Sequence, residues 1–152
     1  MGDKNVERFE ELRQFFGERD RFAAHNGIEI LEISPGRARV RMEVAEHHLN
    51  GLDRVHGGAV FSLADLAFAA ASNSHGSAAM GINASIAYVK EAAGDVLFAE
   101  AEEVSRSHRL ATYSIRVTDA SGQTVALFQG TVYRREGQAI PPPGWEGASF
   151  IG

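Results

Sequence analysis

Apolar residues recur at helical spacing in two parts of the chain. Between Val6 and Phe16 they recur every three or four positions among charged residues, which predicts an amphipathic helix that Gly17 ends or interrupts. From Gly57 to Asn73 the chain is rich in Ala and nearly free of charge, which predicts a second helix about 25 Å long. Because this second helix lacks a charged face, we expect it to be buried.

Alternating apolar and polar residues predict strands on both sides of the long helix. Residues 28–33 and 38–44 alternate on either side of the turn at Ser34-Pro35-Gly36 and predict a hairpin. A long buried helix between a hairpin and a run of further strands predicts an α+β domain, in which an antiparallel sheet curls around the helix. The further strand-like segments cover residues 79–89, 95–105, 109–118 and 123–134.

The length of 152 residues, with 44% hydrophobic content, suits one domain. We expect this domain to cover residues 1–135, with its core at residues 27–134. Residues 136–152 include Pro141-Pro142-Pro143 and show no periodicity, which predicts a flexible tail.

Composition excludes several classes of function. Without Cys the chain has no disulfide, thiol nucleophile or Cys-based zinc site. The N-terminus is polar where a secretory signal would be apolar, and the most apolar segment, Ala59 to Ala71, is shorter than the roughly 20 residues that span a bilayer. We therefore expect a cytoplasmic protein without a membrane partner. A net charge of -5 argues against nucleic-acid binding, so an anionic ligand would have to meet a local basic patch.

Asp65 is the only charged residue between Gly57 and Ser74. An isolated carboxylate in an apolar helix is costly unless it is paired or hydrogen-bonded. One interpretation is a carboxylate that reaches solvent through a gap or caps another element. The other is a catalytic carboxylate, which the apolar surroundings and the upstream His-Gly-Gly favour.

His56, Gly57 and Gly58 stand where the long helix begins. A helix start leaves free N–H groups and the positive end of the helix dipole, an arrangement that suits an oxyanion. Glycine also lets a substrate approach the backbone closely. The alternative is a Gly-Gly turn that enters a helix beside a surface His.

Two segments of the chain resemble a known family. In order, spacing and flanking strands, residues 27–134 resemble the phenylacetic-acid-degradation family of hotdog-fold acyl-CoA thioesterases. The resemblance implies the hotdog fold, in which a curved sheet wraps around one long helix. The two segments are His56-Gly57-Gly58-Ala-Val-Phe61-Ser-Leu63-Ala64-Asp65-Leu-Ala67-Phe68-Ala69 and Val125-Ala126-Leu127-Phe128-Gln129-Gly130-Thr131-Val132-Tyr133-Arg134.

The resemblance also implies roles for single residues. Asp65 is the catalytic carboxylate, acting as a nucleophile or as a general base on water. The Gly57 N–H polarises the thioester carbonyl, and His56 orients the thioester or the loop. Asn50 matches the position that holds the attacking water or the carboxylate, although Asn50-Gly51 is also an ordinary turn pair. Further substrate contacts fall to Gly58 and Phe61.

Coenzyme A is the leaving group in this family, so it belongs to the substrate and product and is no separate cofactor. Its phosphates need cations, and the basic residues at strand ends that could converge on them are Lys90, Arg106 and Arg109. The family commonly has Arg-Pro where this chain has Lys90-Glu91. His47 and His48 lack the spacing of a helical zinc site, so we expect no metal.

The leading hypothesis is hydrolysis of an aryl- or medium-chain acyl-CoA to the free acid and CoA. The alternatives are a hotdog-fold dehydratase or hydratase acting on acyl-CoA, and a non-catalytic module that binds acyl-CoA. The family also implies a homodimer or homotetramer. On one helix His56 and Asp65 would lie about 13 Å apart and on opposite faces. We therefore expect each active site to take these two residues from different chains.

Overall fold

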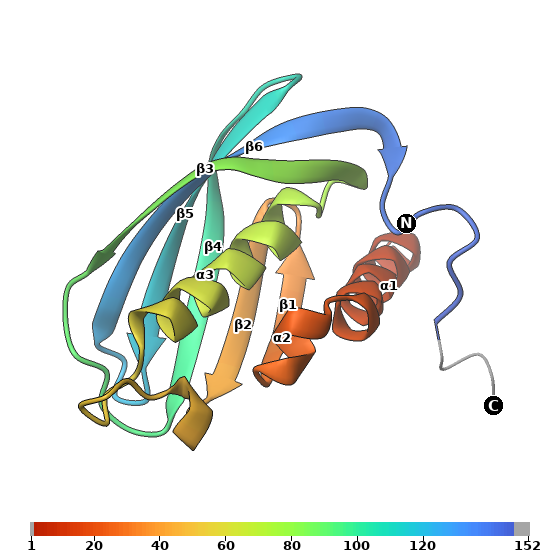
Figure 1. Cartoon of the computed structure of the whole chain (residues 1–152). Helices are drawn as coiled ribbons and strands as arrows, with labels where there is room; N and C mark the ends of the chain where they lie inside the picture. Colours follow the sequence, from red (N-terminus) through yellow and green to blue (C-terminus); the bar gives the residue numbers. More distant parts are fainter. Residues whose placement is uncertain (1, 148–152) are drawn as a thin grey trace.

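Figure 1 shows the computed structural model of the chain, which describes residues 2–147. Six antiparallel strands form one sheet that curves around a long central helix. This arrangement confirms the predicted α+β fold. In chain order the elements are α1 (Gly2–Arg19), α2 (Arg21–His25), β1 (Ile28–Ser34), β2 (Arg37–Glu43), the 3-10 helix η1 (Glu46–His48), α3 (Gly57–Ser72), β3 (Ser77–Tyr88), β4 (Val96–Arg106), β5 (Leu110–Asp119) and β6 (Thr124–Ala139).

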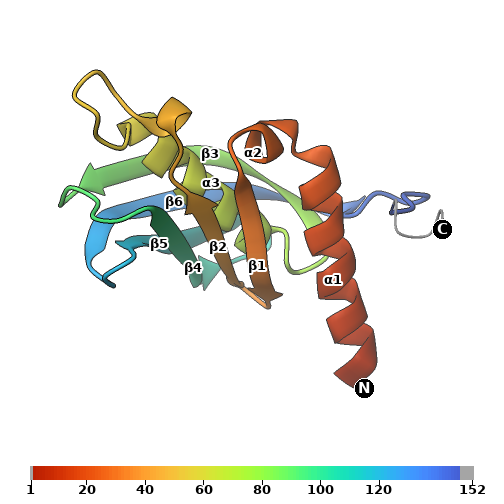
Figure 2. The same ribbon diagram turned by 90° about the horizontal axis from the view of Figure 1, so that it is seen from below.

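The strand order in the sheet is β1-β2-β4-β5-β6-β3, so β1 and β3 form its two edges. The hairpin of β1 and β2 forms as predicted, and β2 then pairs with β4 rather than with β3. The chain crosses from β2 to the far edge through α3, which packs against β2, β4 and β5 on the inner face of the sheet (Figure 2). This crossover places the uncharged helix in the core.

Small side chains let α3 lie close to the sheet. Four alanines of the helix have no solvent exposure. Successive strand residues point to opposite faces, so every second residue of a strand faces the helix. In β5 these inward residues are all buried. The buried residues are Ala64, Ala67, Ala70 and Ala71 on α3, and Ala111, Tyr113, Ile115 and Val117 on β5.

The alternating arginines of β2 lie on the outer face of the sheet and pair with glutamates of neighbouring strands. Arg37 pairs with Glu102 at 2.6 Å and Arg39 with Glu100 at 3.2 Å. Exposed ion pairs contribute at most about 1 kcal/mol each. Their main consequence is that this half of the outer face is charged and compatible with solvent.

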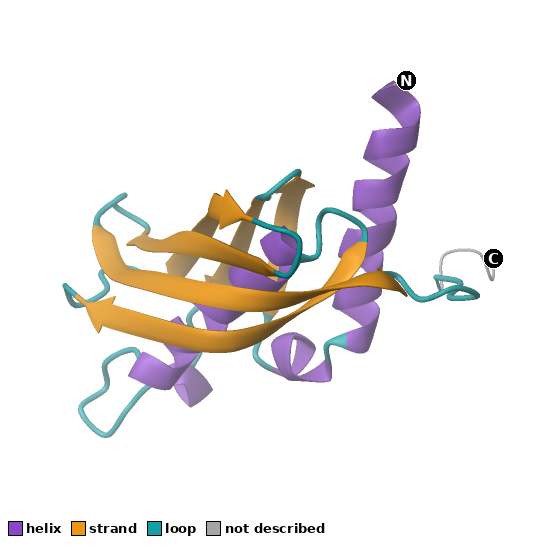
Figure 3. Ribbon diagram, turned by 90° about the horizontal axis from the view of Figure 1, so that it is seen from above, coloured by secondary structure: helices purple, strands orange, loops and turns teal. Residues whose placement is uncertain are grey.

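The N-terminal helix is longer than the sequence predicts. It continues through Gly17 to Arg19, because a glycine on an exposed helix face lowers stability without breaking the helix. A short second helix, α2, begins after Asp20, whose Oδ1 accepts a 2.9 Å hydrogen bond from the Ala23 N–H. In Figure 3 α1 stands beside the sheet and extends beyond it. Its one fully buried side chain in the described region is Leu12.

The last strand runs further than expected. The predicted strand ends at Arg134 and the predicted domain at Arg135, whereas β6 continues to Ala139. Beyond it, the Trp145 ring packs edge-on against Phe15 of α1 at 5.5 Å between ring centroids. The end of the predicted flexible tail, residues 148–152, lies outside the described residues. Among residues 2–147, no helix is both long and apolar enough to cross a membrane.

Candidate active site

The start of α3 presents a free backbone donor. His56 is the N-cap of this helix, and its Nδ1 accepts a 2.8 Å hydrogen bond from the Gly58 N–H. Since Nδ1 is an acceptor, the neutral ring carries its proton on Nε2. The Gly57 N–H has no acceptor anywhere in residues 2–147. A carbonyl oxygen at this point would meet one unpaired N–H and the positive end of the helix dipole.

Tyr88, the last residue of β3, covers Gly57. Its hydroxyl donates a 3.0 Å hydrogen bond to the Gly57 carbonyl, and a Cβ added to Gly57 would lie 3.2 Å from the Tyr88 ring. The lack of a side chain at position 57 is what allows this close contact. Gly57 and Tyr88 also line a pocket of about 320 Å³, together with Lys90. Gly57, which carries the predicted oxyanion donor, and Lys90, one predicted phosphate contact, therefore line the same pocket.

Glu91 does not neutralise Lys90 in this structure. The Glu91 carboxylate is paired with Arg54 instead. Lys90 has no ion-pair partner in the described part of the chain. Where the family commonly has Arg-Pro, this chain has Lys90-Glu91, and the side chain of Lys90 remains available as a cation at the pocket.

Asp65 lies in the middle of α3 on a part of the helix that the single chain leaves exposed. Within residues 2–147 its carboxylate makes no hydrogen bond or ion pair. Desolvation by the surrounding protein raises the pKa of this carboxyl, and the negative charge of Asp20 raises it further. Since a higher pKa makes the carboxylate a stronger base, Asp65 suits proton abstraction near neutral pH better than a free aspartate does.

One chain does not bring Asp65 to the Gly57 N–H. The helix is continuous from Gly57 to Ser72, so the two residues are separated by about 12 Å along its axis. His56 has φ -64° and ψ 137° and precedes the helix, so the opposite-face argument, which holds for a continuous helix, does not apply to it. The axial separation of Gly57 and Asp65 does not depend on that angle.

Asn50 lies in the loop that leads to His56. Its Oδ1 accepts hydrogen bonds from the N–H groups of Leu52 at 2.9 Å and Arg54 at 3.1 Å. These contacts make Asn50 a turn residue, as its pairing with Gly51 suggested. The carboxamide Nδ2 has no partner among the described residues, so it is free to meet water or a carboxylate.

Phe61 is half-buried one turn after Gly57. Its ring packs edge-on against Phe128 of β6, with centroids 5.2 Å apart. Gly58 is exposed, but its N–H is taken by His56. Gly58 could therefore contact the substrate only by van der Waals contact and not through its N–H. Phe61 could contact the substrate with the exposed part of its ring.

Known proteins resemble this chain over most of its length. Residues 52–126 match the thioesterase superfamily. A relative from Archaeoglobus fulgidus, provisionally named an esterase, is 43% identical over 86% of both chains. The acyl-coenzyme A thioesterase PaaI of Escherichia coli is 40% identical over 77% of this chain and 84% of that protein. The chain belongs to the PaaI-like family of thioesterases.

Solved structures of similar proteins have the same fold. The Escherichia coli PaaI protein from the phenylacetic acid degradation operon matches with a TM-score of 0.81 and 36% identity, over 85% of this chain and 94% of that chain. A Streptococcus mutans protein solved with acetyl CoA matches with a TM-score of 0.67 and 28% identity, over 71% and 88% of the two chains. The hotdog fold is thus confirmed, and the chain is a thioester hydrolase.

The remaining predicted contacts of this PaaI-like chain, Arg106 and Arg109, do not converge with Lys90. The Lys90 N–H bonds to the Val125 carbonyl at one end of β6, whereas the Arg109 carbonyl accepts from the Arg134 N–H near the other end. Nine residues of extended strand separate these ends by about 30 Å. Within one chain the three cations therefore form two groups and no single phosphate site.

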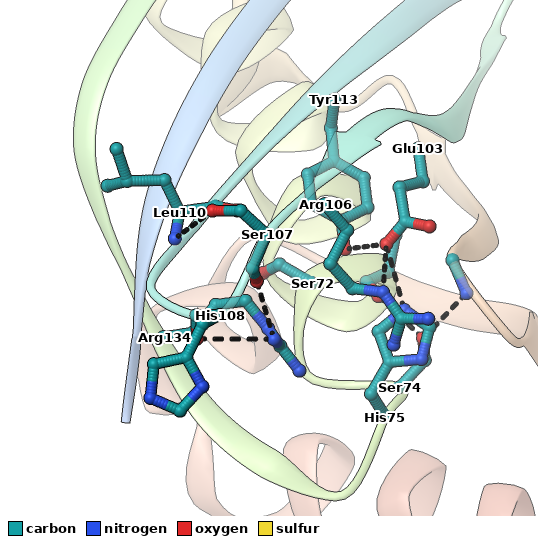
Figure 4. Close-up of polar contacts among 12 residues, drawn as sticks. Ser72, Ser74, His75, Glu103, Arg106, Ser107, His108, Leu110, Tyr113 and Arg134 are labelled. Carbon is teal, nitrogen blue, oxygen red and sulfur yellow. Dashed lines mark hydrogen bonds and ion pairs between the residues drawn. The ribbon is translucent and has the colours of Figure 1, made fainter. Parts of the chain in front are cut away.

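Arg106 belongs to a polar cluster beyond the C-terminal end of α3, drawn in Figure 4. Glu103 Oε1 accepts a 2.9 Å hydrogen bond from the buried Tyr113 hydroxyl and lies 2.9 Å from His75 Nε2 and 3.5 Å from Arg106 Nε. Burial and the bond to Glu103 raise the pKa of Tyr113 well above its usual value. The neutral Tyr113 thus links β5 to β4 through Glu103. Arg106 already forms an ion pair with Glu103, so it is less available to a ligand.

Two residues near the PaaI-like site escape sequence analysis. Tyr88 covers Gly57 from a different element, 31 positions away, and no spacing rule links the two. Asp20 acts on Asp65 through its charge, and the sequence alone gives no sign of this, because the two residues are 45 positions apart. The described residues contain no group of three or more His, Asp or Glu placed to hold a metal ion.

Proposed function

We propose that this chain hydrolyses the thioester of an aryl- or medium-chain acyl-CoA, with Asp65 as the catalytic carboxylate and the Gly57 N–H polarising the carbonyl. The observation that carries the proposal is the unpaired Gly57 N–H at the start of the same helix that holds an unpaired, unusually basic Asp65. The name of the Escherichia coli relative and the acetyl CoA held by the Streptococcus mutans relative support acyl-CoA as the substrate class.

The reaction follows from these two groups. Asp65 takes a proton from a water that attacks the carbonyl carbon, or its carboxylate attacks that carbon directly. The carbonyl oxygen becomes negative, and the Gly57 N–H and the helix dipole stabilise it, an effect that typically contributes about 3 kcal/mol per donor. The C–S bond then breaks and CoA leaves as thiolate. The water route releases the acid in this step, whereas direct attack leaves an acyl–Asp65 anhydride that a water molecule hydrolyses before the acid is released. A single turnover in ¹⁸O-water that yields unlabelled acid would identify direct attack.

The site needs a second chain, because about 12 Å of helix separates the two catalytic groups. The edge strand β3 supports this step. Its residues 80–85 are all exposed, including Met80 at 52% and Ile82 at 60%, and it pairs only with β6 among the described strands. A long apolar edge is a template for another strand. Two copies joined at β3 around a two-fold axis would form two equivalent sites and cover Asp65.

The pocket beside Gly57 supports the placement of CoA. Its volume of about 320 Å³ and its Lys90 suit part of an anionic ligand, whereas the whole protein is acidic. Arg106 and Arg109 would reach the same CoA only from the partner subunit, since they lie at the far end of the sheet. The acyl group would then point along α3 toward Asp65. A homodimer is the minimum active unit, a homotetramer is compatible with it, and we expect it in the cytoplasm.

A thiol-release screen tests the proposed function. The full-length protein is incubated with CoA esters of aryl, hydroxyaryl and straight-chain acids, and free CoA thiol is measured over time. We expect turnover with aryl or medium-chain esters. Change at an acyl double bond without thiol release would assign the chain to dehydratases or hydratases and refute the proposal. Binding without turnover across the whole panel would refute it as well.

A further inference from the structure

His48 is a buried imidazole whose two ring nitrogens are both engaged. It is 3% exposed, and it ends the 3-10 helix η1. Its Nδ1 accepts a 2.9 Å hydrogen bond from the Ala45 N–H, and its Nε2 lies 2.8 Å from the Asn26 carbonyl. Since Nδ1 is an acceptor, Nε2 carries the proton and donates it to Asn26. Burial lowers the pKa of His48, which keeps the ring in the neutral form that this arrangement requires.

The backbone of His48 closes the loop that leads into α3. Its carbonyl accepts a 2.7 Å hydrogen bond from the His56 N–H. The next pair of residues inside the loop, Leu49 and Val55, forms an isolated antiparallel β-bridge. The loop closed in this way carries Asn50, and the residue that ends it is the N-cap of α3. The ring of His48 ties the base of the loop to Asn26, the C-cap of α2.

We infer that His48 is a positioning residue, whose ring holds loop 49–55 and thereby the Gly57 N–H and His56 in the geometry that the thioester needs. This inference rests on the proposed function, because it concerns how the same site is held. The ring itself does not reach the substrate, since it is buried and both nitrogens bond to the protein backbone. Its neighbour His47 is exposed and makes no side-chain hydrogen bond within the described residues, although the two rings lie 4.1 Å apart.

The two ring bonds can be removed one at a time. His48→Asn keeps an acceptor near the Nδ1 position for Ala45 and loses the bond to Asn26. His48→Gln keeps a donor near the Nε2 position for Asn26 and loses the acceptor. His48→Phe fills the space with neither. His47→Phe adds the same ring at the adjacent exposed position and serves as the matched control.

The test combines steady-state thiol release with hydrogen–deuterium exchange on the full chain. We expect His48→Phe to lower kcat by about 100-fold, the effect of a misplaced catalytic group, with KM changed much less. The Asn and Gln variants should fall between wild type and Phe. Amides of residues 49–57 should exchange faster in all three, while those of β4 and β5 keep their protection. His47→Phe should match wild type in both measurements.

The outcomes separate this inference from the proposed function. If the wild-type protein releases no thiol, the proposed function fails, and the inference fails with it. If wild type is active and kcat is unchanged in the Asn and Gln variants, the inference alone is overturned. Those two variants carry the test if the Phe variant does not fold. Faster exchange spread evenly over the strands would also overturn it, because it would show a general loss of stability.

Discussion

Asp65 is a stronger base than an ordinary aspartate because two effects act in the same direction. The surrounding protein partly desolvates the carboxylate although the residue is exposed in the single chain, and the negative charge of Asp20 acts on it as well; both raise its pKa. No cation or donor in the described residues opposes them. A carboxylate that caps another element would have a donor as partner, so the absence of one argues against the capping role.

The first prediction concerns the charge of Asp65. We expect Asp65→Asn to lower kcat for thiol release by about 10²- to 10⁴-fold, the usual contribution of a general base. The melting temperature should stay the same or rise, because the change removes a desolvated charge. A variant that folds and keeps a near-normal kcat would rule out the catalytic role. Asp95→Asn, at an exposed position, is the control.

The stability difference between Asp65→Asn and wild type should depend on pH. Because the folded-state pKa of Asp65 lies above the usual aspartate value of 3.8, the native state binds the proton more tightly than the unfolded state. The ionised Asp65 therefore lowers the free energy of unfolding of the wild-type protein. This destabilisation is full above the raised pKa and disappears as the pH falls toward 3.8. Melting curves of both proteins should therefore converge in acid, whereas parallel curves would show that Asp65 carries no such penalty.

The second prediction isolates the charge of Asp20. Asn caps a helix about as well as Asp, so Asp20→Asn should keep α2 and remove only the negative charge. We expect the pKa of Asp65 to fall, which moves the acidic limb of the kcat/KM profile to lower pH. The measurement is thiol release across pH with an aryl-CoA ester. An acidic limb at the wild-type position would exclude any influence of Asp20 on the base.

At the scale of elements, periodicity predicts the regular parts of the fold and fails where local signals are short. The uncharged block from Gly57 predicts α3 to within one residue, because a long buried helix leaves a long pattern. The helix α2 has five residues and only one buried side chain, so it leaves almost no pattern. The extension of β6 to Ala139 is exposed and polar, and pairing with β3 rather than burial keeps it extended.

The candidate site also has a part that the sequence predicts and a part that it does not. Gly57 and Asp65 share one helix and His56 is its N-cap, so the separation of Gly57 and Asp65 along the helix could be predicted from the sequence. The three cations stand at the ends of different strands, and a sequence marks a strand end without telling at which edge of the sheet it lies. The register of β3 with β6 and of β6 with β5 settles that question, and it separates Lys90 from the two arginines.

The third prediction follows from this separation. Lys90→Ala should raise KM for acyl-CoA about 10-fold with little change in kcat, as expected when one charge-assisted contact to the ligand is lost. Lys4→Ala, on the exposed start of α1, is the matched control. A KM that responds to Arg109→Ala and not to Lys90→Ala would place the CoA phosphates at the opposite end of the sheet.

At the scale of the whole molecule, the two catalytic groups require two chains, which leads to the fourth prediction. His56→Ala and Asp65→Asn homodimers should each be poorly active, because every site has lost one partner. A mixed dimer would contain one intact site, with His56 and Gly57 from one chain and Asp65 from the other, and one doubly damaged site. Co-refolding equal amounts of the two variants should therefore restore activity.

Random pairing sets the size of the recovery. Half of the dimers would be mixed and half of their sites intact, so about a quarter of all sites should regain wild-type turnover. Thiol release is compared with that of each parent, and mass labelling of one variant shows whether subunits have exchanged. Two samples refolded separately and then combined without exchange should stay at the parental level. If labelled subunits mix and the activity still remains at the parental level, Gly57 and Asp65 act within one chain, and α3 would have to bend or break between them.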